Sequence, residues 1–98
     1  MAKTPEGEVK DYAYSALAKV GCLVRKISYE GRNGCPDLLV VAPTGVIVLV
    51  ELKKSEGKRA DPHQEREHKR IAKRGAPIKL IGSKRQIDLL IEELKLCD

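Results

Sequence analysis

Two short apolar runs separated by a three-residue turn constrain the fold of this chain most strongly. Residues 38–42 (LLVVA) and 46–50 (VIVLV) are rich in β-branched and aliphatic side chains, and Pro43-Thr44-Gly45 lies between them. β-branched residues favour extended backbone, and proline and glycine are the residues that tight turns favour. The pattern therefore predicts a β-hairpin in the middle of the sequence.

The charged residues at the open end of this hairpin are expected to lie close together. Asp37 precedes the first strand, and Glu51 and Lys53 end the second. Antiparallel pairing brings these ends side by side, and alternation along the strand places Glu51 and Lys53 on one face with Leu52 on the other. Two carboxylates can hold a hard divalent cation, with the Leu52 carbonyl as a further ligand. The alternative interpretation is a surface ion pair at the strand ends.

The spacing of these charged residues resembles a nuclease motif. Pro36-Asp37 followed by Glu51-x-Lys53 is similar to the PD-(D/E)xK motif, and the likeness extends to Gly31-Arg32-x-Gly34 before it and Gln64 after it. Together these residues resemble the VRR-NUC (virus-type replication-repair nuclease) family, in its stand-alone phage and bacterial form, over residues 6–82. The resemblance implies an α/β fold with a restriction-endonuclease-like core. This agrees with the α-β-β-β-α-β-α order and the mixed sheet flanked by helices that the whole chain predicts.

The first helix is predicted over residues 5–20. Thr4 is a suitable N-cap, the proline after it fits the first helical turn, and Gly21 ends the helix. Extending the apolar stripe of this helix by one turn toward the N-terminus places Glu6 on the face toward the sheet. Glu6 matches the helix glutamate of the family, with Glu8 as the substitute. The alternative role of Glu6 is to favour the positive end of the helix dipole.

The remaining elements follow from periodicity and from turn residues. The predicted order is a strand over 22–29, a loop over 30–34, a flexible polar segment over 54–60, a helix from Asp61-Pro62 to Gly75, a strand over 77–81 and a last helix from Lys84. In the loop, Arg32 either meets a phosphate beside Asp37 or is an ordinary loop arginine. For Gln64, in the first turn of the second helix, the resemblance implies that it orients water or phosphate.

The two histidines could be mistaken for metal ligands. His63 and His68 are five residues apart, so they do not share a helix face well. We interpret His68 as a packed or hydrogen-bonded residue and His63 as solvent-exposed.

The positive charge of the chain is concentrated after the predicted catalytic strand. Residues 53–74 hold nine Lys and Arg against four Asp and Glu, and this excess of five equals the formal net charge of the whole chain, +5. A basic stretch in this position suits a polyanionic substrate such as DNA or RNA. The alternative is a solvated helix face of mixed charge. The predicted DNA-binding residues are Arg32, Lys54, Lys58, Arg59, Arg66, Lys69 and Arg70.

Length and composition bound the remaining possibilities. Ninety-eight residues predict a single VRR-NUC-like nuclease domain over 1–98, and the absence of tryptophan and phenylalanine predicts an aliphatic core. No apolar run approaches the roughly 20 residues of a membrane span, and the N-terminus lacks a secretory signal. We therefore expect a cytoplasmic protein of a bacterium or of a phage-infected host cell. Cys22, Cys35 and Cys97 lack metal-ligand spacing and are interpreted as reduced and unpaired.

These observations predict a metal-dependent endodeoxyribonuclease, a phosphodiester hydrolase, that uses Mg²⁺ or Mn²⁺ and no small-molecule cofactor. Asp37, Glu51 and the Leu52 carbonyl would hold the metal, and Lys53 would position the attacking water. Glu6 would complete the carboxylate set, for a second metal or as a base. The resemblance implies in-line attack that leaves a 3′-hydroxyl and a 5′-phosphate. The predicted catalytic residues are Glu6, Asp37, Glu51, Lys53 and Gln64.

The substrate is expected to be selected by its shape. A chain this short has no room for a separate domain that reads base sequence. Stand-alone members of the family resemble Holliday junction resolvases of DNA repair and recombination, which act as homodimers because two symmetric cuts in a four-way junction need two active sites. The alternatives are a flap or single-strand nuclease, and a non-catalytic basic module that binds nucleic acid. The basic module leaves Asp37 and Glu51, which repel phosphate, unexplained.

Overall fold

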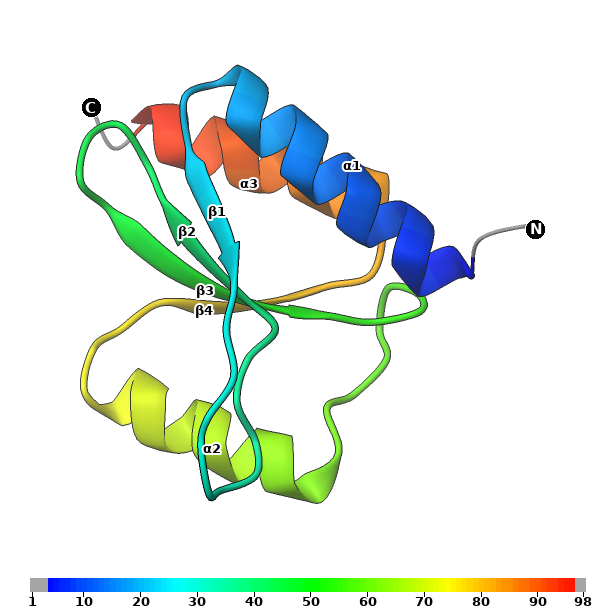
Figure 1. The fold of residues 1–98 in the computed structure, drawn as a ribbon, viewed down its shortest axis with the longest axis vertical. Helices are drawn as coiled ribbons and strands as arrows, with labels where there is room; N and C mark the ends of the chain where they lie inside the picture. The colour runs from blue at the N-terminus through cyan, green and yellow to red at the C-terminus, as the bar shows by residue number, and fades with distance from the viewer. Residues whose placement is uncertain (1–3, 97–98) are drawn as a thin grey trace.

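The computed structural model describes residues 4–96, which form one four-stranded sheet with helices on both faces (Figure 1). The α/β class and the predicted order α-β-β-β-α-β-α are confirmed. In chain order the elements are α1 (Pro5–Lys19), β1 (Leu23–Lys26), β2 (Leu38–Val41), β3 (Ile47–Leu52), α2 (Pro62–Lys73), β4 (Ile78–Ile81) and α3 (Lys84–Leu96).

The sheet is mixed, with its strands in the order β1-β2-β3-β4. The first three strands pair antiparallel, and the predicted hairpin turns at Gly45, whose φ is +93°. β4 lies parallel to β3 because α2 carries the chain back across the sheet. In the hairpin register Leu38 pairs with Val50, so Asp37 and Glu51 are neighbours at its open end.

The core lies between the sheet and the pair α1 and α3, while α2 covers the opposite face (Figure 1). Alternate strand residues such as Val24, Val40 and Val50 point into this core, where they meet Leu17 and Ile87. The core is aliphatic, as the composition predicts. No helix among the described residues is long and apolar enough to cross a bilayer.

Both predicted helix starts are present. The Thr4 hydroxyl accepts a hydrogen bond from the Gly7 N–H at 3.0 Å, and the Asp61 carboxylate accepts one from the Gln64 N–H at 2.9 Å. Each cap is followed by proline at the first helical position. The Gln64 side chain also returns to the Asp61 N–H at 3.4 Å, which completes a capping box. The box fixes the first turn of α2 and, with it, the direction of the Gln64 side chain.

β1 ends at Lys26, three residues before its predicted end. One further hydrogen bond joins the Ile27 N–H to the Asp37 carbonyl at 3.0 Å, and the chain then leaves the sheet. The loop that follows extends across α2 (Figure 1), where the Tyr29 hydroxyl donates to Glu67 at 2.5 Å. Contacts with α2 therefore replace strand pairing over residues 28–36.

Gly34→Ala is expected to destabilise the protein by about 2–5 kcal/mol. Gly34 has a φ of +94°, and an added Cβ would lie 2.9 Å from both the Glu67 Cβ and the His63 carbonyl oxygen of α2. The left-handed backbone costs alanine about 1–2 kcal/mol, and crowding a packed contact adds about 1–3 kcal/mol. Urea unfolding followed by circular dichroism measures the loss.

Gly31→Ala is the matched control for this prediction. Gly31 also has a positive φ, +76°, but an added Cβ would meet nothing within 4 Å. It should therefore carry only the backbone cost of about 1–2 kcal/mol. Equal losses in the two variants would contradict a tight contact between this loop and α2.

Contacts with the start of α3 hold the polar segment 54–60, which the sequence predicted to be flexible. Glu56 accepts hydrogen bonds from the Ser83 hydroxyl at 2.5 Å and from Arg85 Nε at 3.0 Å, and these bonds lower the pKa of the Glu56 carboxyl. The Ser55 backbone passes so close to Gly82 that a Cβ there would lie 2.2 Å from the Ser55 carbonyl oxygen. The exit of β3 is thus fastened to the helix that follows β4.

Candidate active site

Three side chains form a hydrogen-bonded chain at the end of β3. Lys53 Nζ donates to Gln64 Oε1 at 2.8 Å, and Gln64 Nε2 donates to Glu51 Oε2 at 2.8 Å. The Lys53 ammonium also lies 3.6 Å from Glu51 Oε2. Strand alternation points Glu51 and Lys53 toward α2, and the capping box presents Gln64 to them. The structure therefore brings these three predicted residues together.

Asp37 lies at the edge of this cluster. Its Oδ2 accepts a hydrogen bond from the Leu52 N–H at 2.8 Å, so one of its carboxylate oxygens is tied to the end of β3. Its negative charge raises the pKa of the Glu51 carboxyl. A carboxylate that contributes to the raised pKa of Glu51 in this way lies close enough for the two groups to act on one ion.

Glu51 is the most deeply buried of the predicted residues. Only 2% of its surface is exposed, and Oε1 has no hydrogen-bond partner within the described chain. Burial, followed by the charge of Asp37, raises the pKa of Glu51 to about 7, and the Lys53 ammonium opposes this rise. A buried carboxyl group that has one oxygen without a hydrogen-bond partner and lies beside a second carboxylate lacks enough positive charge nearby to balance it.

His68 is a buried neighbour of this cluster that sequence reasoning did not count as a site residue. Its Nε2 lies 3.9 Å from Glu51 Oε1, and neither atom has a hydrogen-bond partner among the described residues. Burial lowers the pKa of His68, so a neutral ring faces Glu51 at pH 7. The sequence feature that could have indicated His68 as a site residue is its position one helical turn after Gln64. His63 is exposed, as predicted.

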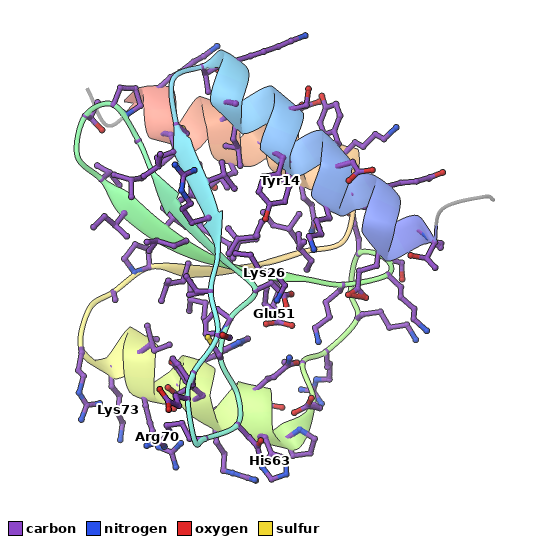
Figure 2. All side chains as sticks on the ribbon, viewed as in Figure 1. Tyr14, Lys26, Glu51, His63, Arg70 and Lys73 are labelled. Atoms are coloured by element: carbon purple, nitrogen blue, oxygen red, sulfur yellow. The ribbon has the colours of Figure 1, made fainter. Side chains whose placement is uncertain are left out.

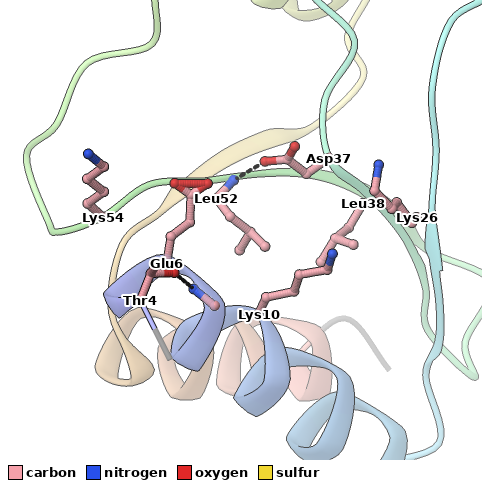
Figure 3. Close-up of a pocket in the computed structure, with 9 residues that line it drawn as sticks. Thr4, Glu6, Lys10, Lys26, Asp37, Leu38, Leu52 and Lys54 are labelled. Atoms are coloured by element: carbon pink, nitrogen blue, oxygen red, sulfur yellow. Dashed lines mark hydrogen bonds between the residues drawn. The ribbon is translucent and has the colours of Figure 1, made fainter. Parts of the chain in front are cut away.

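A cavity of about 390 Å³ opens between the start of α1 and the ends of the strands (Figure 3). Glu6 and Asp37 both line it, whereas Glu51 and Lys53 do not. Glu6 is half-buried there and Glu8 is exposed, so Glu6 is the α1 carboxylate that faces the sheet. Glu6 thus shares a cavity with Asp37 and lies apart from the Glu51 cluster on the α2 face.

No family model matches the sequence. Known proteins are nevertheless similar to it over most of its length. A solved structure described as a VRR_NUC domain superposes with a TM-score of 0.87 and 56% sequence identity, covering 92% of this chain and 97% of that one. The protein named "Putative nuclease p44" of Acyrthosiphon pisum secondary endosymbiont phage 1 is 35% identical over 78 residues, which cover 80% of this chain and 83% of that protein. The chain belongs to the VRR-NUC family.

The PD-(D/E)xK motif of the VRR-NUC family implies a divalent cation, and the residues at the open end of the hairpin fit one. Within residues 4–96 no three His, Cys, Asp or Glu side chains gather closely enough to hold a metal by themselves. The pair Asp37 and Glu51 nevertheless offers the unpartnered, buried Glu51 Oε1 and the negative charge that raises the Glu51 pKa. Carboxylate oxygens suit Mg²⁺ and Mn²⁺. Backbone or water oxygens would have to complete the shell, and the Leu52 carbonyl stays a predicted ligand.

The predicted DNA-binding residues of this VRR-NUC domain fall into two groups. In the first group the cations are paired: Arg32 and Arg70 lie 3.9 and 3.3 Å from Glu67 Oε1, and Lys69 lies 3.8 Å from Glu65. Arg32 therefore lies against α2, whereas the sequence placed it beside Asp37.

The second group consists of exposed side chains: Lys54, Lys58 and Arg59 in the segment between β3 and α2, and Arg66 in α2. Arg66 contacts the His63 ring at 3.1 Å. Figure 2 shows His63, Arg70 and Lys73 on the side of α2 that faces away from the sheet. The outer face of α2 thus carries the helical part of the basic stretch 53–74, and part of its charge is neutralised by Glu65 and Glu67.

The two described cysteines are free thiols, as predicted for Cys22 and Cys35. Burial raises the pKa of both thiols, and a thiol that stays protonated is a poor nucleophile. Cys97 lies outside the described residues.

Proposed function

We propose that this VRR-NUC domain is a metal-dependent DNA endonuclease. One observation carries the proposal: Lys53, Gln64 and Glu51 form a network of 2.8 Å hydrogen bonds beside Asp37, at the buried end of a strand. Charged groups are costly to bury, so an ammonium beside two carboxylates is poorly explained by stability alone. The same groups are those that phosphodiester hydrolysis requires.

Each residue of the site has a definite role in this proposal. Asp37 and Glu51 would hold Mg²⁺ or Mn²⁺, which when bound polarises a phosphoryl oxygen and lowers the pKa of a water molecule. Lys53 orients the attacking water and stabilises the negative charge that develops on phosphorus. Gln64 bonds to Lys53 and to Glu51, so it holds the two at a fixed separation. Glu6 acts from the cavity that it shares with Asp37, toward a second cation or as a base.

The reaction is hydrolysis by in-line attack. The water oxygen bonds to phosphorus, the bond from phosphorus to the 3′ oxygen breaks, and a proton passes to that oxygen. The products are a 3′-hydroxyl and a 5′-phosphate.

The proposed substrate is a four-way DNA junction, cut by a homodimer. Within residues 4–96 every helix and strand builds the sheet or its cover, so no element is left to read base sequence in a groove. This favours a substrate that is recognised by its shape, such as branched DNA. Two symmetric cuts require two active sites, which a two-fold dimer supplies.

A cleavage assay with three labelled DNAs tests the function. A four-way junction, a linear duplex of matched sequence and a flap are each incubated in magnesium and in manganese, with Asp37→Ala as the control. We expect paired symmetric nicks in the junction, an intact duplex and no cutting by Asp37→Ala. Cutting of the flap or of single strands alone would reject the resolvase and keep the endonuclease. No cutting of any DNA would reject the endonuclease and favour a basic binding module.

A further inference from the structure

Three lysines surround the cavity between α1 and the sheet. Lys10 comes from α1, Lys26 from the end of β1 and Lys54 from the segment after β3, and all three line the cavity with Glu6 and Asp37. Figure 3 shows Lys10 and Lys26 toward the Asp37 end of the cavity and Lys54 at the other end. Three lysines and two carboxylates thus line one concave space. Lys10 and Lys26 lie outside the basic surface of residues 53–74.

The fold explains why these lysines meet. In β1, Val24 is buried toward α1 and α3, and Lys26, two residues later, lies on the same face of the strand. Lys26 pairs with the core residue Leu38, immediately after Asp37. On α1, Lys10 follows Glu6 by four residues, so the two side chains share one helix face. The aliphatic core therefore ends in a basic rim beside Asp37.

The ion pairs of the described chain leave Lys10 and Lys26 available. On the α2 side Glu67 pairs with Arg32 and Arg70, and Glu65 pairs with Lys69. None of the ion pairs found within residues 4–96 involves Lys10 or Lys26. Lys10 and Lys26 are therefore more available to bind an added anion than Arg32 and Arg70, which already pair with Glu67.

We infer that Lys10 and Lys26, together with Lys54, bind a backbone phosphate of the DNA on the α1 side of Asp37, next to the phosphate that is cut. Lysine binds phosphate as a flexible point charge, which suits side chains that converge from three elements. The substrate strand then crosses the end of β3, with the basic residues of α2 on one side and this cavity on the other. The inference rests on the proposed function, because the ligand is the substrate.

Affinity for DNA at several salt concentrations tests the inference without requiring cleavage. A fluorescent four-way junction is titrated with protein in calcium, and anisotropy gives the affinity of wild type, Lys10→Gln and Lys26→Gln. Glutamine keeps much of the aliphatic stem and removes the charge. Loss of one phosphate contact should lower affinity roughly 5–10-fold at 0.1 M salt and reduce the slope of log affinity against log salt by about 0.9. Lys19→Gln, at the far end of α1, should match wild type, and thermal melting checks that each variant is folded.

Two outcomes separate this inference from the proposed function. If the double variant Lys10→Gln with Lys26→Gln keeps the affinity and the salt slope of wild type, the inference is overturned, even when wild type cuts DNA. If the variants lose affinity and slope as expected but wild type cuts no DNA, the phosphate site stands and the nuclease function fails.

Discussion

Lys53→Ala is expected to slow DNA cleavage about 10²–10³-fold, the usual loss when a group that stabilises transition-state charge is removed. The Lys53 side chain is only 17% exposed, and its ammonium is held by Gln64 and Glu51. Such a group contributes little to general attraction of DNA, so affinity in calcium should stay near that of wild type. Single-turnover cleavage in magnesium measures the rate, and anisotropy in calcium measures the affinity.

Lys53→Met is the matched variant, because it keeps an aliphatic side chain of similar length and removes the ammonium. It should be as slow as Lys53→Ala, whereas Lys19→Ala should cleave at the wild-type rate. If both Lys53 variants cleave DNA at the wild-type rate, Lys53 has no catalytic role. A fall in DNA affinity as large as the fall in rate would make Lys53 a binding residue instead.

Glu51→Gln is expected to remove a pH-dependent loss of stability from the metal-free protein. Folding raises the pKa of Glu51 from 4.5 to about 7, so the folded carboxyl keeps its proton where the unfolded carboxyl has lost it. The folded state therefore binds more protons between these values, and stability falls as the pH rises through this range. The stability that comes from the proton on folded Glu51 is fully present below pH 4.5 and is lost above pH 7. At roughly 1.4 kcal/mol per pH unit, the loss is about 3 kcal/mol.

Urea unfolding in EDTA at pH 4.5 and at pH 8 measures this difference. Wild type should lose about 3 kcal/mol more than Glu51→Gln between the two pH values, because the glutamine carries no titrating proton. Magnesium at pH 8 should stabilise wild type more than the variant, since a cation that binds only the folded state shifts the equilibrium toward it. Parallel pH curves for the two proteins would show that Glu51 titrates normally and is not crowded by Asp37.

Elements that depend on neighbouring residues could be predicted from the sequence. The hairpin turn at Gly45 and the helix starts at Thr4 and Asp61 each need only a few adjacent side chains, and all three are present. The meeting of Glu51 and Lys53 with Gln64 was also predictable. Strand alternation points the first two the same way, and the family resemblance supplied the third.

Features that depend on how distant elements pack could not be predicted. His68 becomes a neighbour of Glu51 only because α2 lies close over β3. The period of a helix, about 3.6 residues, does not by itself predict how closely the helix packs on a strand. Arg32 turns to Glu67 because its loop leaves the sheet for α2. Lys10 and Lys26 share a cavity because the N-terminal turns of α1 lie beside Lys26, the last residue of β1.

Gln64 belongs both to the cap of α2 and to the active-site network, so it links the first turn of this helix to the active site. Its Oε1 accepts from Lys53 and from the Asp61 N–H, and its Nε2 donates to Glu51. Helix ends open locally far more often than the whole protein unfolds. Opening of the first turn of α2 would take the common partner from Lys53 and Glu51 together, without breaking a hydrogen bond of the sheet. The network of three side chains therefore depends on the first turn of one helix as well as on the pairing of the sheet.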